Sequence, residues 1–203
     1  MNDIQNYLII LENLLNKRRL QHSLQVMKIS EELALHYNCD KQKAIIAGLL
    51  HDCAKCLETD VLLNYAKNSG IFIDKIMVSQ KELLHGPAGK YVAEKIFLIN
   101  DVDILNAIAY HTTGRENMSL LEKIIYVADI IEPSRCFSGI ELIRELAFKD
   151  LDKSIIKAME STLKYVFDLG GLVHPYTINA RNQLILQNSL LSDRRDLTYE
   201  NQD

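Results

Sequence analysis

Residues 41–55 read KQKAIIAGLLHDCAK. This stretch indicates the fold class, and it also contains polar residues that we expect to be buried. Small and apolar side chains recur at helical spacing through its first ten residues, and His51 continues the same face. A buried polar group without a partner destabilises a fold, so an apolar face that ends in His-Asp needs a compensating contact. We therefore expect a helix over residues 41 to about 54 that carries His51 and Asp52 inward.

The rest of the chain shows the same helical periodicity and none of the alternation that is typical of β-strands. It contains no internal repeat, and its three prolines lie at the start of an expected helix or outside the expected helices, where they do not interrupt the apolar pattern. The sequence therefore predicts an all-α fold, a single helical bundle. The expected helices cover residues 4–15, 20–37, 41–54, 59–68, 73–82, 87–98, 101–111, 119–131, 138–147 and 150–168.

The composition is typical of one globular domain. The 203 residues are 48% hydrophobic and carry a net charge of -4, which does not favour binding to duplex nucleic acid. The longest apolar run, at residues 44–50, is shorter than the ~18–20 residues that cross a bilayer. The N-terminus lacks the basic segment of a secretory signal, and the four cysteines suit a reducing compartment. We expect a cytoplasmic protein without a membrane partner, with one domain over residues 1–190 and a polar tail over 191–203.

Three further positions place a polar residue where a helix should be apolar. His22, His111 and Asp129 each lie on the inner face of a predicted helix. A single inward histidine is usually a core residue whose ring nitrogens find hydrogen-bond partners within the protein. Four helices that each carry such a group favour a metal centre, because neutral imidazoles and carboxylates bind divalent cations and the cation offsets their desolvation.

This order of separated His, His-Asp and Asp residues resembles the pattern of the HD superfamily, and two further histidines match its binuclear branch. The matching residues are His22, His51, Asp52, His85, His111 and Asp129. Within that superfamily the chain resembles the symmetrical dinucleoside tetraphosphate hydrolases of the YqeK type. The stretches that carry this resemblance are RRLQHSLQV (18–26), GLLHDCAK (48–55), HGPAG (85–89), YHTTG (110–114), YVADIIEPSR (126–135) and HPYTINARN (174–182).

The resemblance implies an HD-domain bundle with two divalent metal ions that are bridged by Asp52. Similar proteins hold iron and split diadenosine tetraphosphate into two ADP, and manganese, cobalt, nickel or zinc would suit the same donors. A hydroxide shared by the metals is the expected nucleophile. ADP leaves as a stable anion, so no protein general acid is expected. The first metal is expected on His22, His51, Asp52 and Asp129, and the second on Asp52, His85 and His111.

Basic residues near these motifs are candidates for binding the anionic substrate. Lys55 lies one helical turn beyond His51 if the helix continues, and Arg135 follows a helix end beside Asp129. A solvated surface charge is the alternative interpretation for each basic residue. We expect Asp52 and Lys55 to be catalytic. Substrate contacts are predicted for Arg19, Lys55, Arg135, Arg181 and Asn182.

Two other functions stay open at this point. One is another HD phosphohydrolase, acting on a nucleoside di- or triphosphate or on a capped RNA end. Alarmone hydrolases carry an acidic pair after His-Asp where this chain has Cys-Ala-Lys, and the Gly-Tyr-Pro stretch of cyclic-dinucleotide phosphodiesterases is missing. The other is a nucleotide-sensing module without turnover, against which the complete ligand set argues. A homodimer through the C-terminal helices is also left open.

Overall fold

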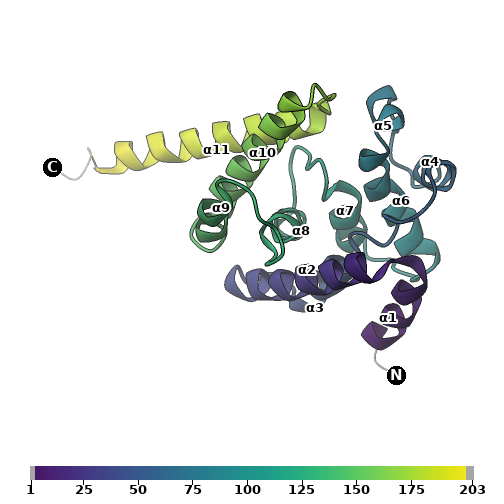
Figure 1. The fold of residues 1–203 in the computed structure, drawn as a ribbon. Coiled ribbons are helices and arrows are strands. Elements are labelled where there is room, and N and C mark those ends of the chain that lie inside the picture. The colour runs from purple at the N-terminus through teal and green to yellow at the C-terminus, as the bar shows by residue number, and fades with distance from the viewer. Residues whose placement is uncertain (1–2, 200–203) are drawn as a thin grey trace.

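The computed structural model describes residues 3–199, with the side chains of residues 4–190, and confirms the all-α fold (Figure 1). These residues form eleven helices and no β-strand. None of these helices is both long and apolar enough to cross a membrane. The helices are α1 (Asp3–Leu14), α2 (Lys17–His36), α3 (Lys41–Leu50), α4 (Thr59–Lys67), α5 (Lys75–Ser79), α6 (Lys81–Lys95), α7 (Val102–Tyr110), α8 (Leu120–Ile131), α9 (Ile140–Ala147), α10 (Leu151–Asp168) and α11 (Pro175–Tyr199).

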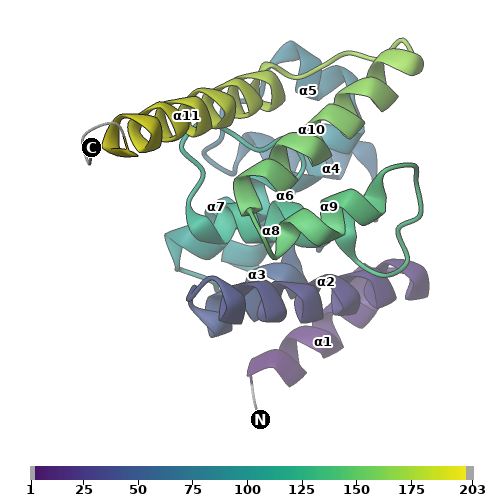
Figure 2. The same ribbon diagram turned by 90° about the vertical axis from the view of Figure 1, so that its left-hand side faces the viewer.

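Helix α8 lies at the centre of the bundle (Figures 1 and 2). It contacts α2, α3, α7, α9 and α10, and its side chains Ile124 and Ile125 are completely buried. A capping box begins the helix: the Glu122 N–H donates to the Ser119 hydroxyl at 3.2 Å, and the Ser119 N–H donates to the Glu122 carboxylate at 3.5 Å. This central position brings Asp129 to the middle of the molecule.

The predicted helix 41–54 ends earlier than expected. Helix α3 stops at Leu50, and tight turns follow, in which the Lys55 N–H donates to the Asp52 carbonyl oxygen at 2.9 Å. The expected end near residue 54 was therefore wrong, and the continued helix on which the predicted direction of Lys55 depended is not formed. The Asp52 carboxylate pairs with Arg19 of α2 at 2.6 Å, so a tertiary contact competes with local periodicity at this point.

The helix predicted to begin at Pro87 begins six residues earlier, so that expectation was also wrong. Helix α6 includes Pro87 in its interior, and His85 lies within the helix instead of before it. A proline inside a helix costs roughly 3 kcal/mol because it removes a backbone hydrogen bond. The turn before it buries Leu84 and His85 almost completely, and this packing offsets the local cost. The preceding helix, expected over 73–82, is reduced to the short α5.

Helix α11 was not among the expected helices, because polar residues interrupt its apolar pattern. Pro175 occupies its first position, where the missing N–H costs nothing. Its first half is bonded to the loop that follows α7. The Thr177 hydroxyl donates to the Thr113 carbonyl oxygen at 2.9 Å, and the Gln183 carboxamide exchanges two hydrogen bonds with Asn117.

The segment predicted as a polar tail, 191–203, continues α11 up to Tyr199, and residues 200–203 lie outside the described part of the chain. In Figure 1 this end of α11 projects beyond the bundle. The apolar side chains of Leu186 and Leu190 on α11 are more than half exposed. The domain boundary at residue 190 and a homodimer through this region stay predictions.

An alanine at Gly86 tests the close approach of α6 to α7. A β-carbon there would lie 2.5 Å from the backbone oxygen of Ala109, which cannot move without shifting α7. We expect Gly86→Ala to lower the free energy of unfolding by about 1–3 kcal/mol, measured by urea or thermal unfolding. Gly89→Ala is the comparison, because its β-carbon would meet the Ile108 Cγ2 methyl at 3.1 Å, a less severe approach that should lower stability less. Equal unfolding midpoints for wild type and Gly86→Ala would contradict the close approach.

Candidate metal centre and adjoining pocket

Side chains from five helices and their ends converge at the middle of the bundle. They include four histidines that are no more than 7% exposed, a buried aspartate and a second aspartate whose side chain is 18% exposed. All six residues predicted as metal ligands are thus brought together. They are His22 on α2, His51 and Asp52 directly after α3, His85 on α6, His111 directly after α7, and Asp129 on α8.

The Asp52 carboxylate lies between two pairs of histidines. Its Oδ2 atom is 3.7 Å from the Nε2 atom of His22 and 3.5 Å from that of His51. Its Oδ1 atom is 3.1 Å from Nε2 of His85 and 3.6 Å from Nε2 of His111. Within the pairs the Nε2 atoms approach to 3.2 Å and 2.9 Å. One carboxylate oxygen therefore faces each pair, which is the arrangement that a bridging carboxylate needs.

Asp129 completes the first of these groups. Its Oδ1 atom lies 3.0 Å from Nε2 of His22 and 3.9 Å from Nε2 of His51. The donor atoms of His22, His51 and Asp129 all lie within 4.8 Å of one another, as do those of His51, Asp52 and His111. The guanidinium of Arg135 lies 2.5 Å from the same Oδ1 atom and favours the ionised form of Asp129.

The hydrogen bonds at the other ring nitrogen define the tautomers of the four imidazoles. The Nδ1 atoms of His51, His85 and His111 lie 2.8, 2.5 and 2.8 Å from the carbonyl oxygen three residues earlier. The Nδ1 atom of His22 lies 3.1 Å from the carboxylate of Glu132. Carbonyl and carboxylate oxygens accept hydrogen bonds, so each Nδ1 donates, and in a neutral ring of this tautomer Nε2 carries the lone pair that a metal needs. Burial also lowers the pKa of His85 to about 4, which keeps this ring neutral at pH 7.

Converging lone pairs of this kind fit a divalent cation. Unprotonated nitrogens as close as these repel each other, and a cation between them turns that repulsion into coordination. The carboxylates of Asp52 and Asp129 supply the negative charge that balances the cation. Imidazole with carboxylate is the donor set of transition metals and zinc, whereas magnesium and calcium prefer oxygen alone.

Glu132 is a fully buried acid beside this centre that sequence reasoning did not assign. Its carboxylate accepts hydrogen bonds from His22 Nδ1 at 3.1 Å, from the Ser134 N–H at 2.7 Å and from the Ser134 hydroxyl at 2.5 Å. In the sequence, Glu132-Pro133 indicates a helix end, where acidic side chains usually face solvent. Periodicity alone contained no sign that this side chain turns inward.

Two of the arginines predicted to bind substrate lie at the rim of the centre. Arg19 places Nη1 2.6 Å from Oδ2 of Asp52, and Arg135 places Nη2 2.5 Å from Oδ1 of Asp129. Their side chains remain 29% and 40% exposed. Each guanidinium therefore reaches a carboxylate of the centre while part of it faces the solvent from which an anion would arrive.

The other predicted substrate contacts lie in two different environments. Lys55 places Nζ 3.2 Å from Nδ1 of His85, and burial lowers the pKa of this lysine. Arg181 instead pairs with Glu160 of α10 at 2.6 Å, and Asn182 is exposed on α11. Lys55 is thus part of the centre, whereas the substrate roles of Arg181 and Asn182 stay predictions.

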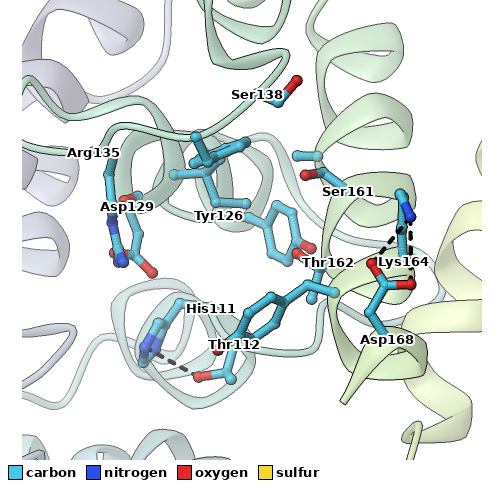
Figure 3. A pocket seen from close by; sticks show the side chains of 14 residues that line it. His111, Thr112, Tyr126, Asp129, Arg135, Ser138, Ser161, Thr162, Lys164 and Asp168 are labelled. Atoms are coloured by element: carbon cyan, nitrogen blue, oxygen red, sulfur yellow. Dashed lines mark hydrogen bonds and ion pairs between the residues drawn. The ribbon is translucent and has the colours of Figure 1, made fainter. Parts of the chain in front are cut away.

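A pocket of about 590 Å³ adjoins the centre between α8, the loop after it and α10 (Figure 3). His111, Asp129 and Arg135 line the end of the pocket that meets the centre, and Ser161 and Thr162 lie on the side formed by α10. Aromatic rings and hydroxyl groups thus share the walls with charged groups. The other aromatic and hydroxyl residues of the lining are Thr112, Tyr126, Phe137, Ser138 and Tyr165.

Comparisons with known proteins agree with this geometry. The HD domain family matches residues 19–134. The "Bis(5'-nucleosyl)-tetraphosphatase, symmetrical" of Halalkalibacterium halodurans is 39% identical over 85% of this chain and 92% of its own length, and that of Bacillus subtilis is 37% identical over 84% and 91%.

A crystal structure from Clostridium acetobutylicum, described as an HD superfamily hydrolase involved in NAD metabolism, matches with a TM-score of 0.87. It is 46% identical and covers 91% of this chain and 97% of its own. The match therefore extends well beyond the helices that carry the histidines. The chain belongs to the HD-domain family and, within it, to the group that contains the symmetrical bis(5'-nucleosyl)-tetraphosphatases.

Proposed function

We propose that this protein is a metal-dependent hydrolase that cleaves dinucleoside tetraphosphates symmetrically, so that diadenosine tetraphosphate and water give two ADP. One observation carries the proposal: the two oxygens of Asp52 face two histidine pairs at the end of a nucleotide-sized pocket. The names of relatives that match most of this chain describe the same reaction, which supports the choice of substrate.

The centre would hold two divalent cations, with Asp52 shared between them. Such cations supply the Lewis acidity and the activated water that attack on phosphorus requires. Iron is our proposed metal because of the family resemblance, and manganese, cobalt, nickel and zinc accept the same donors. The proposed ligands are His22, His51, Asp52 and Asp129 for one cation and Asp52, His85 and His111 for the other.

The pocket supports a nucleotide as the substrate. Its volume of about 590 Å³ lies within the range of small-molecule sites, roughly 300–1,000 Å³. The rings of Phe137 and Tyr165 suit a flat base, and the hydroxyls of Ser138 and Ser161 suit a ribose. A nucleoside held there would direct its phosphates toward Asp129 and the rest of the centre.

Three cationic side chains would bind the phosphates. Arg19 and Arg135 pair with carboxylates of the centre, and Lys55 touches His85, so all three lie where the cleaved bond would be placed. Guanidinium groups match phosphate oxygens in two-pronged hydrogen bonds. Arg181 and Asn182 on α11 are proposed to contact the outer part of the substrate.

Product analysis tests the symmetrical cut. Purified protein, reconstituted anaerobically with Fe(II) and in parallel with Mn(II), is expected to release two ADP for each diadenosine tetraphosphate consumed. Chromatography of the nucleotides after partial conversion measures this ratio. AMP and ATP in equal amounts would reject the symmetrical cut and keep the hydrolase, and no turnover by the metal-loaded protein would reject this substrate.

Replacing the shared carboxylate tests the metal centre. We expect Asp52→Ala to lose bound metal and to lower kcat by more than ~100-fold, because both metals lose a ligand. Elemental analysis of the purified protein, together with steady-state kinetics, measures both effects. Asp60→Ala removes an exposed carboxylate from α4 and serves as the control. A metal-replete, active Asp52→Ala protein would exclude the bridging role.

Replacing the cations beside the centre tests phosphate binding. Lys55→Ala and Arg135→Ala are each expected to raise KM about tenfold or more while metal stays bound, since a hydrogen bond to a charged group contributes roughly 1.5–3 kcal/mol. Arg18→Ala, which removes an exposed neighbour of Arg19, is the control and should leave KM unchanged. Unchanged KM values in both test variants would assign these two residues to structure alone.

A further inference from the structure

The four histidines of the candidate metal centre are held in two different ways. His51, His85 and His111 each donate from Nδ1 to a backbone carbonyl three residues earlier in their own segment. His22 instead donates to the side chain of Glu132, 110 residues further along the chain. Glu132 is therefore the one carboxylate among the four Nδ1 partners.

The position of each histidine in its helix explains part of this difference. His51 and His111 stand at the C-caps of α3 and α7, where carbonyl oxygens of the last turn lack a helical partner and can accept from the ring. His85 stands inside α6 and still donates to a carbonyl of its own helix, so the position in a helix does not by itself dictate the partner. His22 stands inside α2, and its ring reaches the side chain of the C-cap residue of α8 instead.

We propose that Glu132 is a positioning residue of the metal centre, which orients His22 and increases the electron donation of its Nε2 atom through a carboxylate–imidazole hydrogen bond. The inference rests on the metal centre of the proposed function and not on the identity of the substrate. A carboxylate in this position favours the tautomer with the proton on Nδ1, so that Nε2 offers its lone pair at the centre that the Asp129 and Asp52 oxygens also face.

The surroundings of Glu132 suit this role. The side chain is 1% exposed, and both of its oxygens are bonded, one to His22 and the Ser134 hydroxyl and the other to the Ser134 N–H. Arg135 Nε lies 3.7 Å from the oxygen that His22 contacts, so a positive charge accompanies the buried acid. The carboxylate is thus held in one orientation before any ligand binds.

The loop after α8 has a second support that does not involve the Glu132 side chain. Arg144 of α9 donates to the backbone oxygens of Ile131, Glu132 and Arg135, each at 3.0 Å. The loop can therefore keep its path when the Glu132 carboxylate is changed. This separates an effect on His22 from a general collapse of the loop.

Calorimetric titration of metal-free protein with Mn(II) or Co(II) tests the proposal. We expect Glu132→Gln, which keeps an acceptor oxygen but loses the charge, to weaken one of two binding events about tenfold, and Glu132→Ala to weaken it about 10- to 100-fold. The other binding event should keep its affinity. The absorption bands of the Co(II) protein should change with the weakened site, and the metal-free Gln variant should unfold at a temperature close to that of wild type.

Glu145→Gln is the matched control, because it makes the same change at an exposed acid of α9 that pairs with Lys149 and does not contact the centre. It should bind metal as wild type does. A second check combines Glu132→Gln with His22→Ala: once the imidazole is gone, the Gln substitution should add no further loss of affinity.

Two results would overturn the positioning role. One is wild-type metal affinity in both Glu132 variants, and the other is an equal loss in Glu145→Gln, which would assign the effect to the general loss of a negative charge. Failure of the proposed substrate is a separate outcome: protein that binds metal with the expected dependence on Glu132 and yet releases no ADP would keep the positioning role and reject the dinucleotide.

Discussion

Four imidazole nitrogens and two carboxylates meet in the interior of this bundle, and such groups destabilise a fold unless they are paired with one another or with a cation. The helices are arranged around this requirement. Helix α3 stops directly before His51, α7 stops directly before His111, and α6 continues through a proline so that His85 can reach the same point. At each of these positions the regular helix ends or contains an unfavourable residue, and the side chains of the centre converge there.

The charged groups around the centre form an outer and an inner layer, and in each layer carboxylates are paired with hydrogen-bond donors. Asp52 and Asp129 pair with arginines that stay partly exposed, and Glu132 is buried behind His22 with its own hydrogen-bond donors. The outer layer can meet a polyphosphate, because its guanidinium groups already reach the centre. The inner layer cannot, because it is enclosed by α2 and α8. Under the proposed function, substrate and metal would therefore be held by different residues of one continuous network.

The pocket beside the centre determines from which side a ligand can reach these residues. Its inner end carries His111, Asp129 and Arg135, and its outer walls carry aromatic rings and hydroxyls from the loop after α8 and from α10. A ligand that fills it must combine a negatively charged end with a flat, partly polar body. Helix α11 braces the loop that follows His111 through Thr177 and Gln183, so the C-terminal helix supports this end of the pocket from behind.

The sequence alone was sufficient to predict the all-α fold and the six residues that the structure brings together at the candidate metal centre, partly by pattern and partly by resemblance. Inward polar residues such as His22 and Asp129 stand out because helical periodicity is a local property that a single chain displays. The inward turn of Glu132, the place of His85 inside a helix and the pairing of Arg181 with Glu160 could not be read in this way. Each of these depends on contacts between elements that are distant in the chain, and only the packing of the helices decides which side chains meet.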